Sequence, residues 1–479
     1  MSAGTHKPPN ISEVISAIGF GPAQVYTQIL AHGIWVVDGI EFAMVTALAK
    51  PIAHELHLSD LAMASMVAVL FVGTLCGCAI GGLLGDSAGR RSAVLLCYAC
   101  VTVFTLAIVF GTVNFGALMI LRLLLGVSMG IGMPASLALV SEISPPCWRE
   151  TLSGIRGIIF AGGGIIASVI VVSDEPTLVS LAWRTDLTIS VIPSVVLGLL
   201  AIFFLHESPL FLAQSGQHER AREVLKWMRH RNFAADVDVD YESAGMEAAD
   251  ASPKSITCVR GFGIIYGRHL AYTTCTLGFA AFVLNVIEYG SAYAEPRVFQ
   301  HTHASLPAGW QLFFKYLVAL PLRSCAIPIA AILSRRASLK TLTLGCATGL
   351  LIFAWAGSLL HRSLFLAMVY YASQYMTLLS VALGFLVVYQ ASVDMYPTLV
   401  SATGSAVCLG SGRAGGVLAP YLFELVAGAG RWQRFYGAAA AMSLLAAALC
   451  SLLPEAGRAA EEAEAAAEDL KASEALVQP

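Results

Sequence analysis

The chain has 479 residues, of which 57% are hydrophobic and only 12% charged, and its formal net charge is -3. A soluble protein of ordinary composition carries about a quarter charged residues, so this deficit, with repeated uncharged runs of about twenty residues, indicates a polytopic membrane protein. The small net charge and the lack of a basic block with interleaved aromatic residues argue against a nucleic-acid partner.

Residues 1–24 contain no short apolar core followed by a cleavage site, so we expect no removable signal peptide. Twelve runs that are long enough to cross a bilayer as helices follow, six within 25–205 and six within 262–453. The predicted spans are 25–48, 61–84, 92–113, 115–143, 152–172, 187–205, 264–289, 311–333, 342–360, 364–388, 403–427 and 435–453. The sequence therefore predicts an all-α membrane protein of two pseudo-symmetric six-helix bundles.

The segments outside the predicted spans indicate how the chain crosses the membrane. A hydrophilic segment, 206–261, separates the two halves, and an acidic segment, 454–479, follows the last span. Basic residues concentrate on one side of the predicted helices, and the positive-inside rule makes that side cytoplasmic. We therefore expect a multi-pass protein of the plasma membrane or a vesicle membrane, with both termini and the middle segment in the cytoplasm.

The connection between the second and third spans reads GGLLGDSAGRRS, from Gly81 to Ser92. Its glycines let two helix ends approach closely, and its arginines hold the loop at the cytoplasmic surface. A weaker copy, LSRRASLK at 333–340, has Ser334 in the aspartate position. The exits of the fourth and tenth spans, SEISPPCWRETLSG and VDMYPTLVSATGSA, are also alike. The two halves therefore look like copies of one another.

The Gly81–Ser92 connection resembles the G-x-x-x-D-x-x-G-R-R signature of the major facilitator superfamily. The fourth span with its exit, and HESPLFL at 206–212, are similar to patterns of the sugar-porter, organic-ion and synaptic-vesicle-related branches. VVDGIEF at 36–42 resembles the synaptic-vesicle-related and niacin/aromatic-acid transporters. The resemblance implies secondary active transport by alternating access, no enzymatic activity, and a cytoplasmic charge network that helps to hold one open state. The residues expected in this conformational gate are Gly82, Asp86, Gly89, Arg90, Arg91, Glu142, Arg149 and Asp394.

Charged side chains inside membrane spans are costly to bury and are usually paired and functional. Asp38 lies near the middle of the first span with Glu41 one turn further on, and Arg122 reaches a similar depth in the fourth span. We predict an Asp38–Arg122 pair. In the proton-coupled sugar porters that the chain resembles, the matching aspartate and arginine form the coupling pair, so Asp38 and Arg122 are the expected proton-coupling residues. A permanent ion pair that braces the bundle is the structural alternative.

The expected substrate-binding residues line the interior of the bundles. Arg156 and Arg413 are candidate anchors for an anion, because a guanidinium binds a carboxylate bidentately. Alternatively, Arg156 lies near the cytoplasmic end of its helix, and Arg413 belongs to a structural pair in the second bundle. Glu288 is a candidate lining carboxylate unless it lies at the outer mouth of its helix. An aromatic and polar stripe in the tenth span suits stacking on a ring as well as bundle packing. The full expected set is Glu41, Arg156, Asn285, Glu288, Tyr289, Tyr371, Gln374, Tyr375 and Arg413, and Lys315 and Arg323 have no assigned role.

We therefore predict a proton-coupled symporter of a small organic solute, with organic carboxylates, aromatic ones included, as the expected substrates. Two alternatives stay open: an organic cation, which Glu41 and Glu288 would suit equally, and a transporter-like sensor or vesicle protein that binds a ligand without moving it. A hexose is not expected, because the seventh span lacks the paired glutamines of true sugar porters. We expect no cofactor and no metal, and a monomer in the lipid bilayer.

Overall fold

The computed structural model describes residues 9–241, 258–268, 270–301, 306–332, 335–396, 401–427 and 430–453. In these ranges the regular structure is entirely helical. The long segments are α2 (Pro22–Ala47), α4 (Asp60–Ala88), α5 (Arg90–Gly111), α6 (Phe115–Glu142), α7 (Arg149–Asp174), the consecutive α8 (Trp183–Ser190) and α9 (Ile192–Phe204), α14 (Ala271–His301), α15 (Ala308–Ile332), α16 (Arg335–Gly357), α17 (Leu364–Asp394), α18 (Ser401–Ala427) and α19 (Gln433–Cys450). The shorter helices are α1 (Ile11–Ile18), α3 (Ala49–Glu55), η1 (Pro146–Trp148), α10 (Pro209–Gln214), α11 (His218–Arg231), α13 (Cys258–Ile265) and η2 (Leu360–Arg362).

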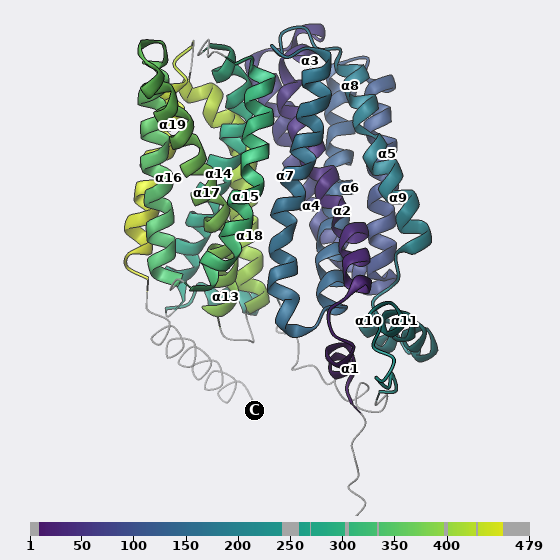
Figure 1. The fold of residues 1–479 in the computed structure, drawn as a ribbon. Helices are drawn as coiled ribbons and strands as arrows, with labels where there is room; N and C mark the ends of the chain where they lie inside the picture. The colour runs from purple at the N-terminus through teal and green to yellow at the C-terminus, as the bar shows by residue number, and fades with distance from the viewer. Residues whose placement is uncertain are drawn as a thin grey trace, which may run out of the picture. The chain divides into compact units, whose positions relative to one another are not determined.

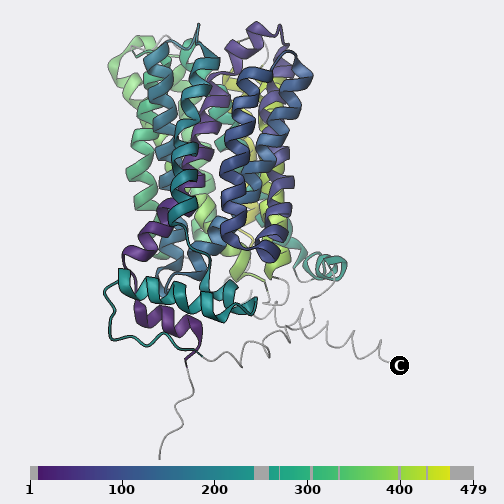
Figure 2. The ribbon, with the colours of Figure 1, turned by 90° about the vertical axis from the view of Figure 1, so that its right-hand side faces the viewer.

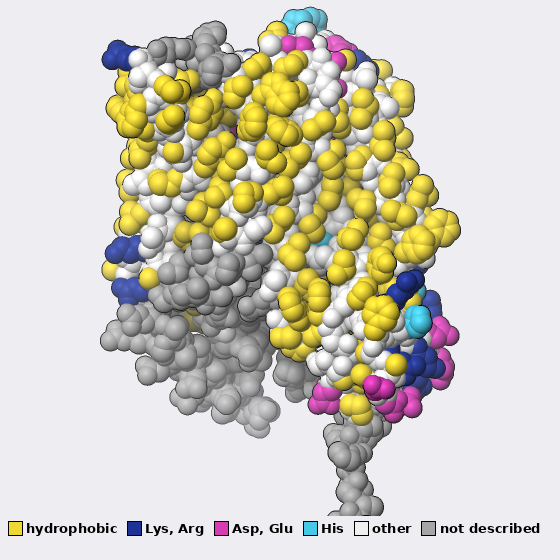
Figure 3. Space-filling view, in the orientation of Figure 1, with side chains coloured by type: hydrophobic (Ala, Val, Ile, Leu, Met, Phe, Trp, Pro, Cys, Tyr) yellow, Lys and Arg dark blue, Asp and Glu magenta, His cyan; other side chains and the backbone are white. Residues whose placement is uncertain are grey.

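The long segments have the composition of membrane-spanning helices. Nine helices in the described ranges are long and apolar enough to cross a membrane. Large apolar side chains point outward from them: Phe110, Phe203 and Ile120 are 79%, 74% and 62% exposed. In the space-filling view hydrophobic side chains cover the middle of the visible face, and charged side chains gather near its two ends (Figure 3). Such a surface suits the hydrocarbon core of a bilayer.

The chain forms two compact units. The first comprises Met1–Phe42, Val72–Ala167 and Trp183–Lys254, and the second comprises Ala43–Phe71, Ser168–Ala182 and Ser255–Pro479. In the first unit α5 packs along α6; in the second, α14 packs along α18, and α16 packs against α17 and α19 (Figure 1). The second unit therefore contains α3 and the beginning of α4 in addition to the helices of the second half of the chain.

A close contact between two helix backbones fixes the position of α2 in the first unit. A Cβ at Gly39 would meet the Phe160 carbonyl oxygen of α7, and a Cβ at Gly163 would meet the Val36 carbonyl oxygen of α2, both closer than real contacts allow. At the neighbouring Gly162 a Cβ would meet nothing within 4 Å. The α2–α7 crossing therefore requires glycine at specific positions, as close helix packing in membranes often does.

At one end of the first unit a small helical layer is attached to the start of α2. Helix α1 packs against α10 and α11 (Figure 2). Its buried side chains are Ile11, Val14, Ile15 and Ile18. Asn232, just after α11, donates from its side-chain amide to the Gly19 carbonyl at 2.9 Å and accepts from the Ala23 N–H at 2.9 Å. These two hydrogen bonds tie the first turn of α2 to α11.

Candidate functional site

The first unit buries an acid and a base that interact. Glu41 of α2 and Arg122 of α6 are 3% and 0% exposed, and each acts electrostatically on the other. Thr105 of α5 donates a hydrogen bond to Oε1 of Glu41 at 2.7 Å. Within the described chain, Oε2 of Glu41 and all three guanidinium nitrogens of Arg122 have no hydrogen-bond partner. A buried carboxylate with one oxygen held and the other unpartnered can bind a proton at the unpartnered oxygen.

This arrangement differs from the predicted Asp38–Arg122 pair. Arg122 makes no hydrogen bond to Asp38, because none of its nitrogens has a partner among the described residues, and the carboxylate that acts on it is Glu41. Asp38 is half-buried on the same helix. At about 100° per residue, positions 38 and 41 point about 60° apart around α2. That difference is enough for one of the two side chains, Glu41, to be directed toward Arg122.

Arg156 of α7 also lies against α2. Its guanidinium carbon is 5.6 Å from the centre of the Trp35 ring, which is a cation–π distance, and its charge acts on the buried His32. His32 Nδ1 is 2.7 Å from the side-chain nitrogen of Gln28. Polar and aromatic side chains thus follow one face of α2. Arg156 lies two turns from the start of α7 and contacts Trp35 in the middle of α2; its role as an anchor stays a prediction.

In the second unit, charged side chains surround one small cavity. Lys315 of α15 and Glu295 of α14 form an ion pair at 2.5 Å, and their side chains are only 9% and 4% exposed. Arg323 and Glu288, from the same two helices, form a second pair at 2.9 Å. The Gln374 amide of α17 donates to Glu295 at 3.3 Å. The cavity measures about 30 Å³ and is lined by Glu288, Glu295, Lys315 and Gln374 among others.

Two predicted substrate-binding residues, Glu288 and Gln374, thus reach the same cavity. Glu288 is not an isolated lining carboxylate, because Arg323 forms an ion pair with it at 2.9 Å. Glu295 and Lys315 complete the site, and sequence reasoning gave neither of them a role. Lys315 lies inside the predicted span 311–333, and a buried charge needs a partner. Glu295, however, lies beyond the predicted span 264–289, and only the longer α14, which ends at His301, places it inside a helix.

The other predicted residues of the second unit lie outside this lining. Arg413 of α18 donates to the Tyr289 hydroxyl at 3.0 Å. The Asn285 side-chain amide donates to the Ala281 carbonyl of its own helix at 2.7 Å, so that donor is occupied by the backbone. Tyr371 and Tyr375 of α17 are half-buried, and the Tyr371 hydroxyl has no hydrogen-bond partner among the residues that the structure describes.

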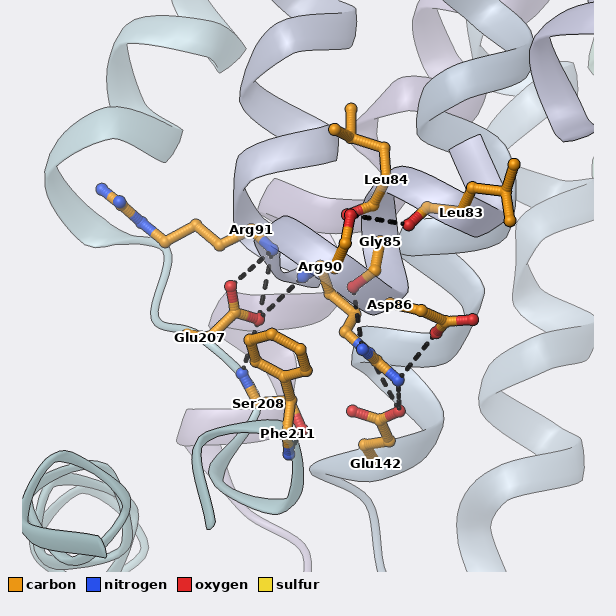
Figure 4. A network of polar contacts seen from close by, with 11 residues as sticks. Leu83, Leu84, Gly85, Asp86, Arg90, Arg91, Glu142, Glu207, Ser208 and Phe211 are labelled. Atoms are coloured by element: carbon orange, nitrogen blue, oxygen red, sulfur yellow. Dashed lines mark hydrogen bonds and ion pairs between the residues drawn. The ribbon is translucent and has the colours of Figure 1, made fainter. Parts of the chain in front are cut away.

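Two of the predicted gate residues, Asp86 and Glu142, form a network around a third, Arg90 (Figure 4). Arg90 NH2 lies 3.1 Å from Glu142 at the end of α6, and both side chains are mostly buried. Arg90 NH2 also lies 3.3 Å from Asp86, whose side chain is 80% exposed, and Arg90 NH1 donates to the Gly85 carbonyl at 2.8 Å. Because exposed ion pairs contribute little, Glu142 is the more important partner.

Glu207 is the member of this network that sequence reasoning missed. Its carboxylate accepts the backbone N–H groups of Arg90 at 3.1 Å, Arg91 at 3.1 Å and Ser208 at 2.9 Å, and so closes the exposed N-terminus of α5. Gly89, which precedes α5, has φ +97°, and a Cβ there would meet this carboxylate. Burial raises the pKa of Glu207, although the N–H donors and Arg90 oppose the shift.

The remaining gate predictions have separate outcomes. Arg91 donates to the Leu205 and Ile202 carbonyls at 2.7 Å each, at the end of α9, where a cation is favourable. Arg149 donates to the Ser144 carbonyl at 3.2 Å. A Cβ at Gly82 would meet nothing within 4 Å, so this structure does not require glycine there. The Asp394 side chain and Ser334 lie outside the described part of the chain.

One end of the second unit carries a further polar cluster that the sequence did not indicate. Arg297 of α14 donates to Glu424 of α18 at 2.6 Å and to the Met63 sulfur of α4 at 3.3 Å. Lys50 of α3 donates to Gln300 of α14 at 2.6 Å. These contacts join α3 and the beginning of α4 to α14 and α18, which explains why Ala43–Phe71 belongs to this unit.

Membrane-length helices that bury paired charges, with a charged loop between the second and third, define a transporter of the major facilitator superfamily. The chain belongs to the sugar (and other) transporter family, whose model matches residues 23–466. The membership that the motifs predicted is therefore confirmed. The members of this superfamily are transporters and not enzymes, and the protein is an integral multi-pass membrane protein.

Similar proteins come from several branches of the superfamily. Synaptic vesicle 2-related protein of Bos taurus is 24% identical over 443 residues, which cover 87% of this chain and 75% of that protein. Organic cation/carnitine transporter 7 of Arabidopsis thaliana is 25% identical over 456 residues, 86% of this chain and 87% of that one. The proton myo-inositol cotransporter of Homo sapiens is 30% identical over 205 residues, 43% of this chain and 30% of that protein.

Solved structures confirm the predicted fold class. The inward-open conformation of the xylose transporter XylE from E. coli has a TM-score of 0.72 and 17% identity, with 91% of this chain and 98% of that one covered. A structure of a D-xylose-proton symporter has a TM-score of 0.68 and 16% identity over 90% and 98% of the two chains. At these identities the likeness establishes the twelve-helix, two-bundle fold alone.

Proposed function

We propose that this protein is a proton-coupled symporter of a small organic solute, and that Glu41 and Arg122 form its proton-coupling centre. The observation that carries the proposal is the state of these two buried groups: Arg122 has no hydrogen-bond partner among the described residues, and Glu41 keeps Oε2 unpartnered. Protonation of Glu41 removes the negative charge that stabilises the Arg122 guanidinium. A buried guanidinium left without a counter-charge is costly, so protonation changes which conformation is preferred.

The names of related proteins support proton coupling. The human myo-inositol cotransporter and the D-xylose symporter are both described as proton-driven. The sequence prediction placed the proton on Asp38. Because Glu41 is the carboxylate that acts on Arg122, we now assign the proton to Glu41 and treat Asp38 as the competing assignment.

For the cargo we propose organic carboxylates, aromatic ones included. Arg156 lies over the Trp35 ring, and Arg413 donates to the Tyr289 hydroxyl. A guanidinium beside an aromatic ring offers bidentate hydrogen bonds to a carboxylate and a surface for a planar hydrocarbon group. We further propose a monomer with both termini in the cytoplasm, at a plasma or vesicle membrane, because the basic residues of the sequence favour that orientation.

The test is uptake into proteoliposomes that contain the purified full-length protein, with and without an inward proton gradient. The panel contains nicotinate, benzoate, tetraethylammonium, xylose and myo-inositol. We expect the gradient to drive accumulation of at least one carboxylate. Glu41→Gln should abolish gradient-driven accumulation but retain exchange of internal for external substrate, because exchange needs no net proton movement.

Asp38→Asn is the matched control, since it also removes one carboxylate from the same helix. It should retain the response to the proton gradient. If Asp38→Asn loses that response while Glu41→Gln keeps it, the proton assignment is reversed. If no solute accumulates under any gradient, symport is refuted, and a ligand-binding protein without transport becomes the better description.

An organic cation is the second candidate cargo. Two carboxylates, Glu288 and Glu295, line the cavity of the second unit, and the name of the Arabidopsis relative includes organic cations. Each of these carboxylates, however, has a basic partner within 3 Å: Arg323 at 2.9 Å and Lys315 at 2.5 Å. Tetraethylammonium accumulation without accumulation of either aromatic acid would select the cation.

A further inference from the structure

The cavity of the second unit has an unusual charge balance. Two acids and two bases lie at it or directly beside it, in the pairs Lys315–Glu295 and Arg323–Glu288. Each pair carries no net charge. The first pair lines the cavity with both of its members, so a ligand that enters there meets an ammonium and a carboxylate side by side.

A ligand with one charge is a poor match to such a pair. An anion that binds Lys315 displaces Glu295 and leaves that carboxylate buried without a counter-charge. A cation that binds Glu295 displaces Lys315 and leaves that ammonium buried without a counter-charge. An unpaired buried charge is strongly unfavourable. A ligand that carries both charges replaces both partners at once and leaves no group unpaired.

Further features of the site agree with this exchange. The Gln374 amide holds Oε1 of Glu295 at 3.3 Å, while Lys315 binds Oε2, so the carboxylate stays oriented when the lysine moves. Lys315 has a flexible four-carbon stem, which allows the pair to open. The rest of the lining includes Phe353, Leu378 and Tyr436, which offers an apolar and aromatic wall to the hydrocarbon part of a ligand and to an alkylated ammonium group.

We propose that this cavity binds a zwitterion, a small organic carboxylate that also carries an ammonium group, with its carboxylate on Lys315 and its ammonium on Glu295. The ligand enters by separating the ion pair, since the free space of about 30 Å³ in the cavity is smaller than such a ligand. This inference rests on the proposed function in that it narrows the class of carboxylate transported. It is nevertheless testable by binding alone.

The test measures binding to the purified full-length protein in detergent by isothermal titration calorimetry. Four probes share one shape and differ in charge: glycine betaine has both charges, tert-butylacetate only the negative one, choline only the positive one, and neopentyl carbinol none. We expect glycine betaine to bind at least about tenfold more tightly than each of the other three, because only it leaves no unpaired buried charge. Equal or tighter binding of tert-butylacetate or choline, or no binding of betaine, overturns the proposal.

Two variants make the test independent of folding efficiency. Glu295→Gln leaves Lys315 without its counter-charge, so the preference should move from glycine betaine to tert-butylacetate. Lys315→Gln should move it to choline. Glu219→Gln, at an exposed carboxylate of α11, is the control and should keep the betaine preference. Misfolding cannot produce two opposite changes of preference, and if both variants keep the original order of probes, the pair does not contact the ligand.

The outcome also separates this inference from the transport proposal. If betaine is preferred in binding but no proton gradient drives its uptake, the cavity assignment stands and symport is wrong. If benzoate accumulates with the gradient and binds more tightly than betaine, symport stands and the zwitterion assignment is wrong.

Discussion

The α2–α7 crossing gives a sharp test of the structure, because adjacent glycines of α7 have opposite surroundings. At Gly163 an added Cβ would meet the Val36 carbonyl oxygen below contact distance and the Ile40 nitrogen at 3.0 Å. At Gly162 it would meet nothing within 4 Å. The perturbation is the same in both cases, glycine to alanine, in the same helix and one residue apart.

The expected magnitudes follow from two effects. Alanine favours a helix over glycine by about 0.5–1 kcal/mol, and this gain applies to both variants. Only Gly163→Ala forces the backbones of α2 and α7 apart, and such overpacking costs about 1–3 kcal/mol. The gain cancels in the comparison, so the Gly163→Ala variant should be less stable than Gly162→Ala by about 1–3 kcal/mol. The Gly162→Ala variant should be as stable as the wild type or slightly more stable.

The assay is thermal unfolding of the two purified variants in the same detergent. At about 1–2 °C per kcal/mol for a long chain, the melting temperature of Gly163→Ala should lie roughly 1–6 °C below that of Gly162→Ala. Transport should follow the same order, because the crossing holds the helix that carries Asp38 and Glu41. Equal melting temperatures, or a lower value for Gly162→Ala, would show that the two helix backbones do not touch as described.

Three further predictions concern single polar groups. Thr105→Val removes the hydrogen bond to Glu41 and should lower the free energy of unfolding by about 1–3 kcal/mol. Thr105→Ser keeps the hydroxyl and should retain proton-driven uptake. Equal uptake by both variants would show that Thr105 does not position Glu41. Glu207→Gln weakens the cap of α5 and should cost about 0.5–2 kcal/mol, seen as a lower melting temperature than in Glu219→Gln. Burial and the charges of Arg91 and Arg231 lower the pKa of His206 from its ordinary value of 6.5. The folded protein should therefore lose stability as the pH drops below about 6.5. His206→Gln should flatten this pH dependence of the melting temperature, and an unchanged dependence would contradict the role of His206.

The Arg90 network shows how far sequence reasoning reaches. The contact of Arg90 with Asp86 is local, four residues along the chain, and the motif placed both residues in the expected gate. Glu142 was expected in the gate from the family resemblance, but its contact with Arg90 across 52 residues was not predicted. Glu207 was missed as a partner, although its motif was recognised, because it meets the Arg90 N–H across 117 residues. A sequence pattern identifies such a residue, but it does not show which helix end the residue closes.

The choice of the proposed coupling carboxylate shows a limit of a different kind. Hydropathy and depth selected Asp38, Glu41 and Arg122 as candidate charges, and the structure shows that Glu41 and Arg122 act on each other. The choice between Asp38 and Glu41 depends on the rotation of α2 about its axis, and a rotation of about 60° exchanges them. That rotation agrees with the close approach of Gly39 and Gly163 and with the hydrogen bond from Thr105 to Glu41, both of which are tertiary interactions. The fold was therefore predictable, and the orientation of one side chain within it was not.

The division of charges between the two units constrains how coupling can work. The acid–base pair, Glu41 and Arg122, belongs to the first unit, and the neutral pairs around Lys315 belong to the second. A proton and a ligand bound in different units need not touch each other. They are coupled if both bind one conformation of the protein more tightly, and the coupling is then reciprocal. Ligand binding in the second unit must in that case change proton binding in the first, and a tenfold mutual effect corresponds to about 1.4 kcal/mol. Neutral pairs suit this mechanism, because the binding affinity of the proposed ligand site would then depend little on pH, and the pH dependence of transport would come from the proposed proton site, Glu41.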